Sequence, residues 1–201
     1  MPDIMGAKDI AFPHLGIYLE NVPKSFTIFG FTIALYGVVI GIGMLLGILL
    51  AAHIAKKENM NPDVIWDFAI YAVIAIIGAR LYYVAFSWDQ YKDNLLSIFY
   101  LRQGGLAIYG GVIGGFATLF IYSYTKKINP FKIGDCAVFG LVIGQIVGRW
   151  GNFFNREVFG GYTDSLFAMR LPVDAVRASD IKQTHLDGMA AMGDVNFIQV
   201  H

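Results

Sequence analysis

An uncharged segment over residues 25–55 constrains this chain more than any other feature. It exceeds the ~20 apolar residues that an α-helix needs to cross a bilayer. We therefore expect a first membrane-spanning helix over residues 28–54, preceded by an irregular or interfacial arm over residues 1–27. Only 15% of the residues are charged and 56% are hydrophobic, whereas soluble domains carry about 25% charged residues. The sequence is that of an integral membrane protein.

Three further apolar segments, at about residues 64–86, 104–124 and 133–154, are the other expected spans. They predict an all-α membrane protein with at least four transmembrane helices in one domain over residues 28–154. Residues 155–201 are polar and mixed in charge, which favours an extracytoplasmic segment. The loops after the first and third spans are the richest in lysine, so the positive-inside rule predicts an N-terminus outside the cell.

Glycines at four-residue spacing recur in the predicted spans. In the third span they form two overlapping pairs, Gly110 with Gly114 and Gly111 with Gly115. Such pairs let a neighbouring helix approach closely and say little about chemistry. We expect tight helix packing there.

Two arginines fall inside predicted spans, where a charged residue costs roughly 2.5 to 3.5 kcal/mol and usually faces the protein interior. Arg80 is near the end of its span, so extension of its side chain to the membrane surface is an open alternative. For Arg149 the alternative is a structural pairing with Asp135, with Glu157 or with a backbone carbonyl. The sequence alone leaves both alternatives open.

The depth of the polar residues suggests a cavity. With about 1.5 Å of rise per residue, Tyr36, Arg80, Tyr109 and Arg149 all lie roughly 8 to 12 Å below the outer ends of their spans. If the fourth span stays helical to Arg156, four polar residues also share one of its faces: Gln145, Arg149, Asn152 and Arg156. Guanidinium groups match phosphate geometry through paired N–H donors. The expected ligand is a phospholipid headgroup at outer-leaflet depth.

The run over residues 148–160 resembles the signature G-R-x-G-N-F-x-N-x-E-x-x-G of the prolipoprotein diacylglyceryl transferases, with every fixed position matched. Residues 35–37, 78–81 and 104–111 also resemble the family, in the same order. The resemblance implies transfer of a diacylglyceryl group from phosphatidylglycerol to the lipobox cysteine of a preprolipoprotein, with release of glycerol phosphate. It also implies a multi-pass protein of the bacterial cytoplasmic (inner) membrane. The nucleophile belongs to the substrate, so Cys136 need not take part.

The resemblance assigns roles to three catalytic candidates. Arg149 is expected to stabilise the leaving phosphate, and Asn152 to position lipid oxygens. Tyr109 stands before Gly110 and Gly111 where many family members have histidine. It is either an arginine-assisted phenolate or a hydrogen-bond partner of lipid, and we prefer the second interpretation. The expected substrate-binding residues are Tyr36, Arg80, Gly110, Gly111, Gln145, Asn155, Glu157, Gly160 and His201.

The same residues are also compatible with other classes of function. A small transporter or channel for an anionic substrate could line its pathway with Arg80 and Arg149, and a structural membrane subunit could carry the same arginines. A net charge of zero without a basic, aromatic patch argues against nucleic acid as a partner. No metal or organic cofactor is expected, because histidines and carboxylates do not occur at ligand spacing.

The end of the sequence gives one more expectation. Family members continue with the motif H-P-x-x-L-Y-E and further spans, and Val200 with His201 matches only the first step into that motif. We therefore expect the sequence to be part of a longer protein. His14, His53 and His185 match no family motif and are expected at the surface or the membrane interface.

Overall fold

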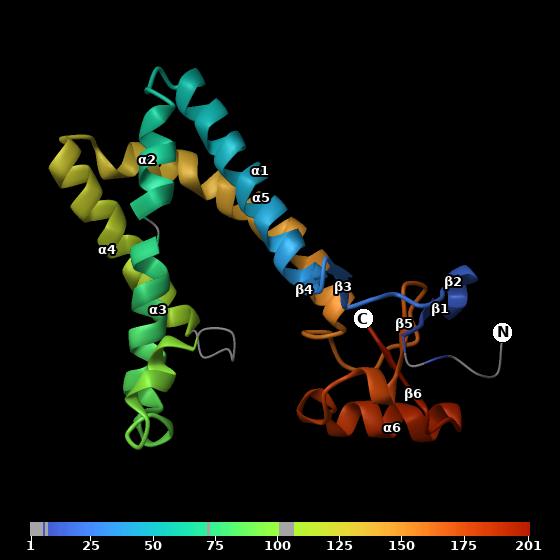
Figure 1. Cartoon of the computed structure of the whole chain (residues 1–201). Coiled ribbons are helices and arrows are strands. Elements are labelled where there is room, and N and C mark those ends of the chain that lie inside the picture. The colour runs from blue at the N-terminus through green and yellow to red at the C-terminus, as the bar shows by residue number, and fades with distance from the viewer. Residues whose placement is uncertain (1–5, 7, 72, 101–106) are drawn as a thin grey trace. The chain divides into compact units, whose positions relative to one another are not determined.

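The computed structural model describes residues 6, 8–71, 73–100 and 107–201 (Figure 1). Its strands and α-helices are, in chain order, β1 (Ile10–Phe12), β2 (Ile17–Leu19), β3 (Ser25–Ile28), β4 (Phe31–Ala34), α1 (Leu35–Lys57), α2 (Asp63–Tyr71), α3 (Val73–Phe86), α4 (Ile108–Lys126), α5 (Pro130–Asn155), β5 (Met169–Pro172), α6 (Gln183–Met192) and β6 (Phe197–Val200). The chain divides into two compact units. The first unit comprises residues 1–43 and 145–201, and the second comprises residues 44–144.

Three helices of the described residues are long and apolar enough to cross a membrane: Leu35–Lys57, Asp63–Phe86 and Pro130–Asn155. The second of them contains both α2 and α3. The third expected span also forms a helix, α4, but its glycines, tyrosines and hydroxyl side chains lower its mean hydropathy, and it is not among the three. Residues 104–106 of that span lie outside the described residues. A fourth crossing at α4 stays a prediction.

Glycines bring α3 and α4 into close contact within the second unit. A Cβ added at Gly110 would lie 2.4 Å from the Cβ of Tyr82, and one added at Gly114 would lie 2.8 Å from the Cα of Ala75. At Gly115, by contrast, an added Cβ would meet nothing within 4 Å. The expectation of tight packing is confirmed for the Gly110 and Gly114 pair, because both backbones touch α3 where a side chain would not fit.

This difference gives a matched pair of substitutions. We expect Gly114→Ala to lower the free energy of unfolding by about 1 to 3 kcal/mol, because the new methyl group overlaps the backbone of α3. Gly115→Ala should be neutral or stabilising by up to about 1 kcal/mol, since alanine favours the helix and meets open space. Thermal unfolding in detergent compares the two variants. Equal effects would contradict the packing described here.

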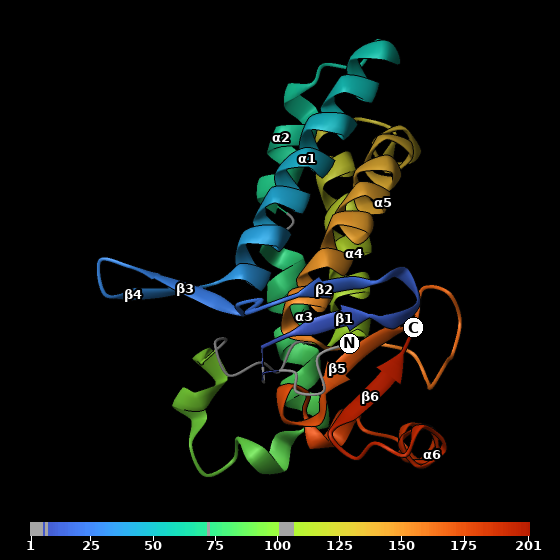
Figure 2. The ribbon, with the colours of Figure 1, turned by 90° about the vertical axis from the view of Figure 1, so that its right-hand side faces the viewer.

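A four-stranded antiparallel sheet in the first unit shows that the all-α expectation is wrong for the extramembrane part. The strand order is β2-β1-β5-β6, so the N-terminal arm pairs with the polar segment after α5 (Figure 2). Ile10, Leu171, Ile198 and Val200 form its core, each 0% exposed. The strands are only three or four residues long. The alternation of apolar and polar side chains in such short strands cannot be distinguished from the pattern of the surrounding loops.

A second correction concerns the start of the first span. Residues expected to begin the helix at Ile28 instead form the hairpin of β3 and β4, and α1 begins at Leu35. Phe29 and Gly30 make the turn with φ of 49° and 81°, as two-residue hairpins of the I′ type require. The segment is as apolar as a helix of the membrane, but it alternates every two residues, which favours a strand.

Candidate active site

The C-terminal turns of α5 present the polar residues of the signature. Gln145, Arg149 and Asn152 all lie within the helix and, at steps of four and three, share one face. The helix ends at Asn155, and Arg156 takes a left-handed conformation with φ of 56°. The face therefore has three of its four expected members, because Arg156 turns out of the helix.

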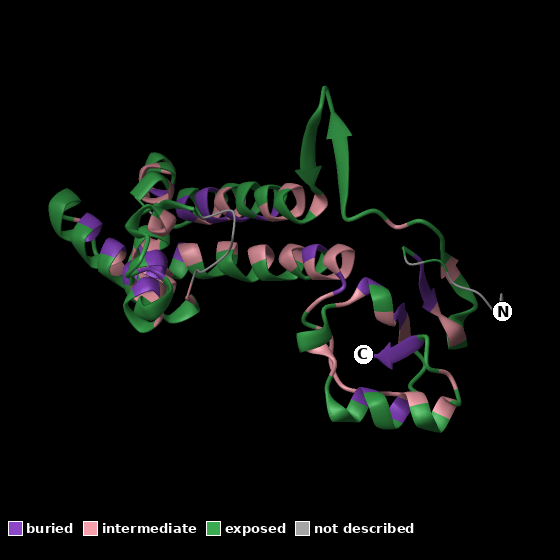
Figure 3. Cartoon of the chain, turned by 60° about the horizontal axis from the view of Figure 1, so that its bottom comes forward, coloured by how far each residue is buried: buried purple, intermediate pink, exposed green. Residues whose placement is uncertain are grey.

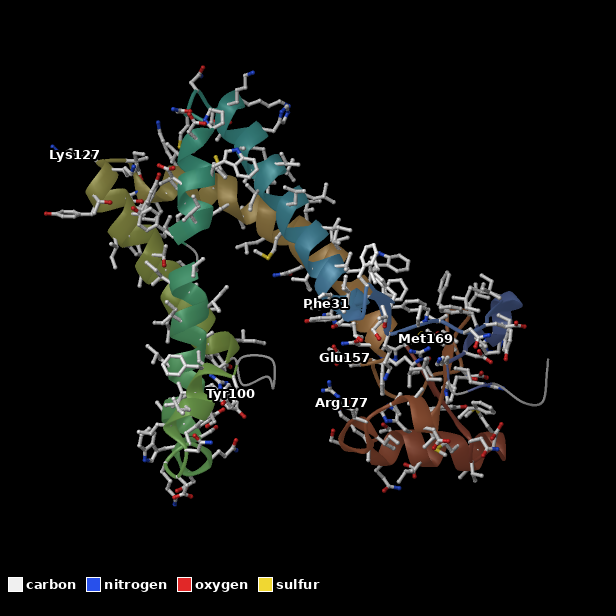
Figure 4. All side chains as sticks on the ribbon, in the orientation of Figure 1. Phe31, Tyr100, Lys127, Glu157, Met169 and Arg177 are labelled. Atoms are coloured by element: carbon white, nitrogen blue, oxygen red, sulfur yellow. The ribbon has the colours of Figure 1, made fainter. Side chains whose placement is uncertain are left out.

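Arg149 is exposed, and among the described residues it has no hydrogen bond or ion pair. The structural pairing considered from the sequence does not occur. Glu157 instead accepts a hydrogen bond from the Asn155 amide at 3.1 Å and lies 3.4 Å from Nη2 of Arg177. Figure 4 labels Glu157 and Arg177, which lie next to each other. The Arg149 guanidinium thus keeps its donors for a ligand.

Tyr36, in the first turn of α1, packs against the signature. A Cβ added at Gly151 would lie 2.9 Å from Cδ2 and 3.2 Å from Cε2 of the Tyr36 ring. Glycine at this position therefore makes room for the ring. The ring remains 37% exposed. The structure brings two predicted site elements together here, the tyrosine of the first span and the signature of the fourth.

Arg156 is the largest fully buried side chain of the chain's described part, at 2% exposure. Its guanidinium donates to the carbonyl oxygens of Phe154 at 3.2 Å, of Val22 at 2.8 Å and of Lys8. Burial lowers the pKa of this guanidinium, and the nearby Asp9 carboxylate opposes that shift. Arg156 fastens the loop after α5 to the N-terminal arm, so it is unsuited to the role of phosphate ligand considered from the sequence.

The end of the signature is held by two histidines. The Gly160 N–H donates to the His201 carbonyl at 2.7 Å, and a Cβ added at Gly160 would lie 2.3 Å from Nε2 of the His201 ring. His185 is 1% exposed, so its expected surface position is wrong. Its Nδ1 accepts from the Lys182 N–H at 2.9 Å, which leaves Nε2 to donate to the Gly160 carbonyl at 2.8 Å. Both backbone groups of Gly160, the N–H and the carbonyl, are therefore hydrogen-bonded to histidines.

Asp9 anchors the N-terminal arm from inside, and sequence reasoning did not find it. Its carboxylate is 7% exposed and accepts hydrogen bonds from the N–H groups of Asn21 at 2.8 Å and Gly6 at 2.6 Å and from the Tyr18 hydroxyl at 2.9 Å. The Asn21 bond above all holds the pKa of Asp9 below its usual range, although burial opposes this. A single aspartate in a polar arm carries no sequence pattern that would reveal this role.

The lowered pKa of Asp9 predicts acid sensitivity of the first unit. A depressed carboxyl pKa stabilises the fold above the unfolded value of about 3.9, and this stabilisation is lost as pH falls through the lower folded value. We expect the difference in unfolding temperature between the parent chain and Asp9→Asn to be largest near pH 6 and to shrink below about pH 4. A difference that stays constant down to pH 3 would contradict the Asp9 anchor.

The other predicted site residues belong to the second unit. Arg80 is 6% exposed, its Nε donates to the Ile98 carbonyl at 2.7 Å, and its Nη2 donates to the Ser97 carbonyl at 2.9 Å. Its guanidinium also lies 5.2 Å from the centre of the Tyr91 ring. These contacts hold Arg80 inside the protein and do not support extension to the membrane surface.

Tyr109 is 74% exposed in the first turn of α4, while Gly110 is buried in the contact with α3. Gly111 lies beside it, 3.7 Å from the Cβ of Ala79 when a Cβ is added. The second unit thus holds Arg80 and Tyr109, and the first holds Tyr36 and Arg149. Their common depth stays a prediction. Among the described residues, no group of three or more histidine, cysteine or carboxylate side chains could hold a metal.

Three helices of the described residues are long and apolar enough to cross a bilayer, which indicates a membrane protein. Residues 23–193 match the family model described as prolipoprotein diacylglyceryl transferase. The chain belongs to this family.

Similar proteins named phosphatidylglycerol–prolipoprotein diacylglyceryl transferase occur in several bacteria. The relative from Halalkalibacterium halodurans is 43% identical over 71% of this chain and 50% of its own length. That from Clostridioides difficile is 44% identical over 70% of this chain and 57% of its own length. That from Clostridium botulinum is 46% identical over 75% and 59%. The chain spans between half and three fifths of the length of these relatives.

Proposed function

We propose that this protein transfers the diacylglyceryl group of phosphatidylglycerol to the thiol of a lipobox cysteine in a preprolipoprotein. The observation that supports this most is the guanidinium of Arg149, which is exposed and has no partner among the described residues, within a fully matched family signature. The names of the relatives supply the lipid and the protein substrate. Family membership does not favour the transporter or channel hypothesis, which explained the same arginines.

The reaction joins the cysteine sulfur to the glycerol carbon that bears the phosphate ester. As the C–S bond forms, the C–O bond breaks, its electron pair goes to the phosphate oxygen, and glycerol phosphate leaves. The thiol must lose its proton for the attack, because the thiolate is the nucleophile; this proton passes to water and balances the second negative charge that glycerol phosphate gains. Negative charge therefore builds up at the departing phosphate, where a fixed cation lowers the barrier.

The residues have distinct proposed roles in this step. Arg149 binds the phosphate and holds it as the C–O bond breaks, and Asn152 on the same face donates to lipid oxygens. Tyr109 forms a hydrogen bond with the lipid, which is the interpretation we prefer. The other proposed substrate contacts are Tyr36, Arg80, Gly110, Gly111, Gln145, Asn155, Glu157, Gly160 and His201.

The proposed reaction takes place at the outer side of the membrane. The site would lie near the outer leaflet of the bacterial cytoplasmic membrane, with the N-terminus outside. The arm over residues 1–27 and the segment over residues 155–201 would then share the outer side, which agrees with their joint sheet of β1 and β5. The lipobox cysteine of an exported protein would reach the site from that side.

A labelling assay with two matched peptides tests the proposal. Vesicles holding the protein are incubated with phosphatidylglycerol labelled in its acyl chains and with a lipobox peptide. We expect acyl label on the peptide through a thioether, and none on a matched peptide whose cysteine is replaced by serine. Label on both peptides, or on neither with folded protein present, would overturn the proposed reaction.

A further inference from the structure

The hairpin of β3 and β4 has two unlike faces. Cross-strand pairs and the alternation of side chains place four large apolar residues on one face: Phe26, Ile28, Phe31 and Ile33. The other face carries Ser25, Thr27, Thr32 and Ala34. We call these the apolar face and the hydroxyl face. On the hydroxyl face, the side-chain oxygens of Thr27 and Thr32 lie 3.4 Å apart.

The apolar face is only partly covered within the described chain: Phe26 and Ile33 near its base are 37% and 36% exposed, and Ile28 is 47% exposed. Phe31 is 76% exposed, and Phe29 at the turn is 97% exposed. Every residue of both strands is exposed, so the hairpin appears entirely green in Figure 3. An isolated two-stranded hairpin is only marginally stable in water. A contiguous exposed apolar face usually marks a contact with a partner or a membrane.

The hairpin is joined to a membrane-spanning helix without a linker. Strand β4 ends at Ala34, and α1 begins at the next residue, Leu35. The Leu35 N–H donates to the Lys24 carbonyl at 3.0 Å, so the hydrogen-bonded ladder continues into the first residue of the helix. Since α1 is long and apolar enough to cross a bilayer, its end fixes the hairpin at the bilayer surface.

The backbone limits how deep the hairpin can lie. Both strands have one unpaired edge, whose N–H and C=O groups need hydrogen-bond partners. The hydrocarbon core offers none, whereas the headgroup region offers water and phosphates. Burial of the apolar face, however, is most favourable at the boundary between headgroups and acyl chains. Both requirements are met when the hairpin lies flat in the interface.

We propose that β3 and β4 form a membrane-binding hairpin, with the apolar face toward the acyl chains and the hydroxyl face toward headgroups and water. Tyr36 follows in the first turn of α1 and packs against Gly151 of the signature. The hairpin therefore sets the depth of the candidate site relative to the lipid surface. This inference does not depend on the proposed reaction.

Fluorescence quenching on the two faces tests the proposal. Single-cysteine variants Phe31→Cys and Thr32→Cys are made in a Cys136→Ala background, labelled with an environment-sensitive fluorophore and placed in vesicles of phosphatidylcholine and phosphatidylglycerol. Neighbouring positions on opposite faces make a matched pair, and both side chains are exposed, so neither change removes a packed core residue. Circular dichroism checks that both variants fold.

We expect spin-labelled acyl chains to quench the label at position 31 at least about twice as strongly as the label at position 32. Iodide in the water should show the reverse preference. Equal iodide quenching on both faces would overturn the proposal. So would a label at position 31 that is shielded only at high protein density, since a second copy of the chain would then cover the face. Shielding that requires a lipobox peptide would overturn it as well.

Discussion

Replacing Arg149 with alanine is expected to lower the rate of the proposed diacylglyceryl transfer by about 10²- to 10³-fold, the usual loss when one preorganised donor to a developing anion is removed. The side chain is exposed and has no hydrogen bond or ion pair among the described residues, so its loss leaves no buried group without a partner. Stability should therefore change little. Turnover of labelled phosphatidylglycerol measures the rate, and thermal unfolding measures the stability.

Two further variants separate charge from geometry at this position. Arg149→Lys keeps a positive charge but loses the paired donors, so we expect a rate between those of the parent chain and Arg149→Ala. Lys132→Ala removes an exposed cation from the first turn of the same helix and should leave the rate near that of the parent. Equal losses in Lys132→Ala and Arg149→Ala would show that general charge, and not a phosphate contact, is responsible.

Replacing Arg156 with alanine should have the largest effect on stability. The guanidinium is 2% exposed and holds the Val22 and Lys8 carbonyls. Its removal leaves these acceptors without their donor and opens a cavity between the arm and the loop after α5. We expect a loss of about 3 to 5 kcal/mol in the free energy of unfolding of the first unit.

The arm should also become easier to cleave in Arg156→Ala, which limited proteolysis measures. Arg177→Ala is the matched control, because Arg177 is 73% exposed and its 3.4 Å ion pair is with Glu157, outside the N-terminal arm. Arg156→Lys should not restore stability, since one ammonium group cannot reproduce the planar set of donors. An Arg156→Ala protein as stable as Arg177→Ala would contradict the structural role of this arginine.

The sequence predicts what depends on long, continuous segments. Helix α5 covers its expected span, and α1 covers all but the first turns of its own, because hydropathy accumulates over some twenty residues. The four-residue spacing of glycines predicts a close helix contact, which Gly110 and Gly114 make with α3, although spacing alone does not distinguish this pair from Gly111 and Gly115. The face of Gln145, Arg149 and Asn152 follows from helical periodicity within the signature. The family is also recognised from residues 148–160, which form one local run.

Contacts between distant parts of the chain could not be predicted from local sequence patterns. The sheet pairs β1 with β5, and Arg156 binds the carbonyls of Lys8 and Val22, which precede it by more than a hundred residues. Backbone carbonyls are the same at every residue, so no side-chain pattern marks those that will accept a hydrogen bond. The hairpin of β3 and β4 was missed for another reason. Its residues are as apolar as the helix that follows, and only their two-residue alternation distinguishes them.

The proposed role of Arg149 is tested most directly by following both products of one reaction. Phosphatidylglycerol is labelled separately in the acyl chains and in the phosphate, and the lipobox peptide and the water-soluble products are collected together. We expect equal amounts of thioether on the peptide and of released glycerol phosphate, both lost together in Arg149→Ala. Phosphate retained on the peptide, or both products formed at the parent rate without Arg149, would contradict it.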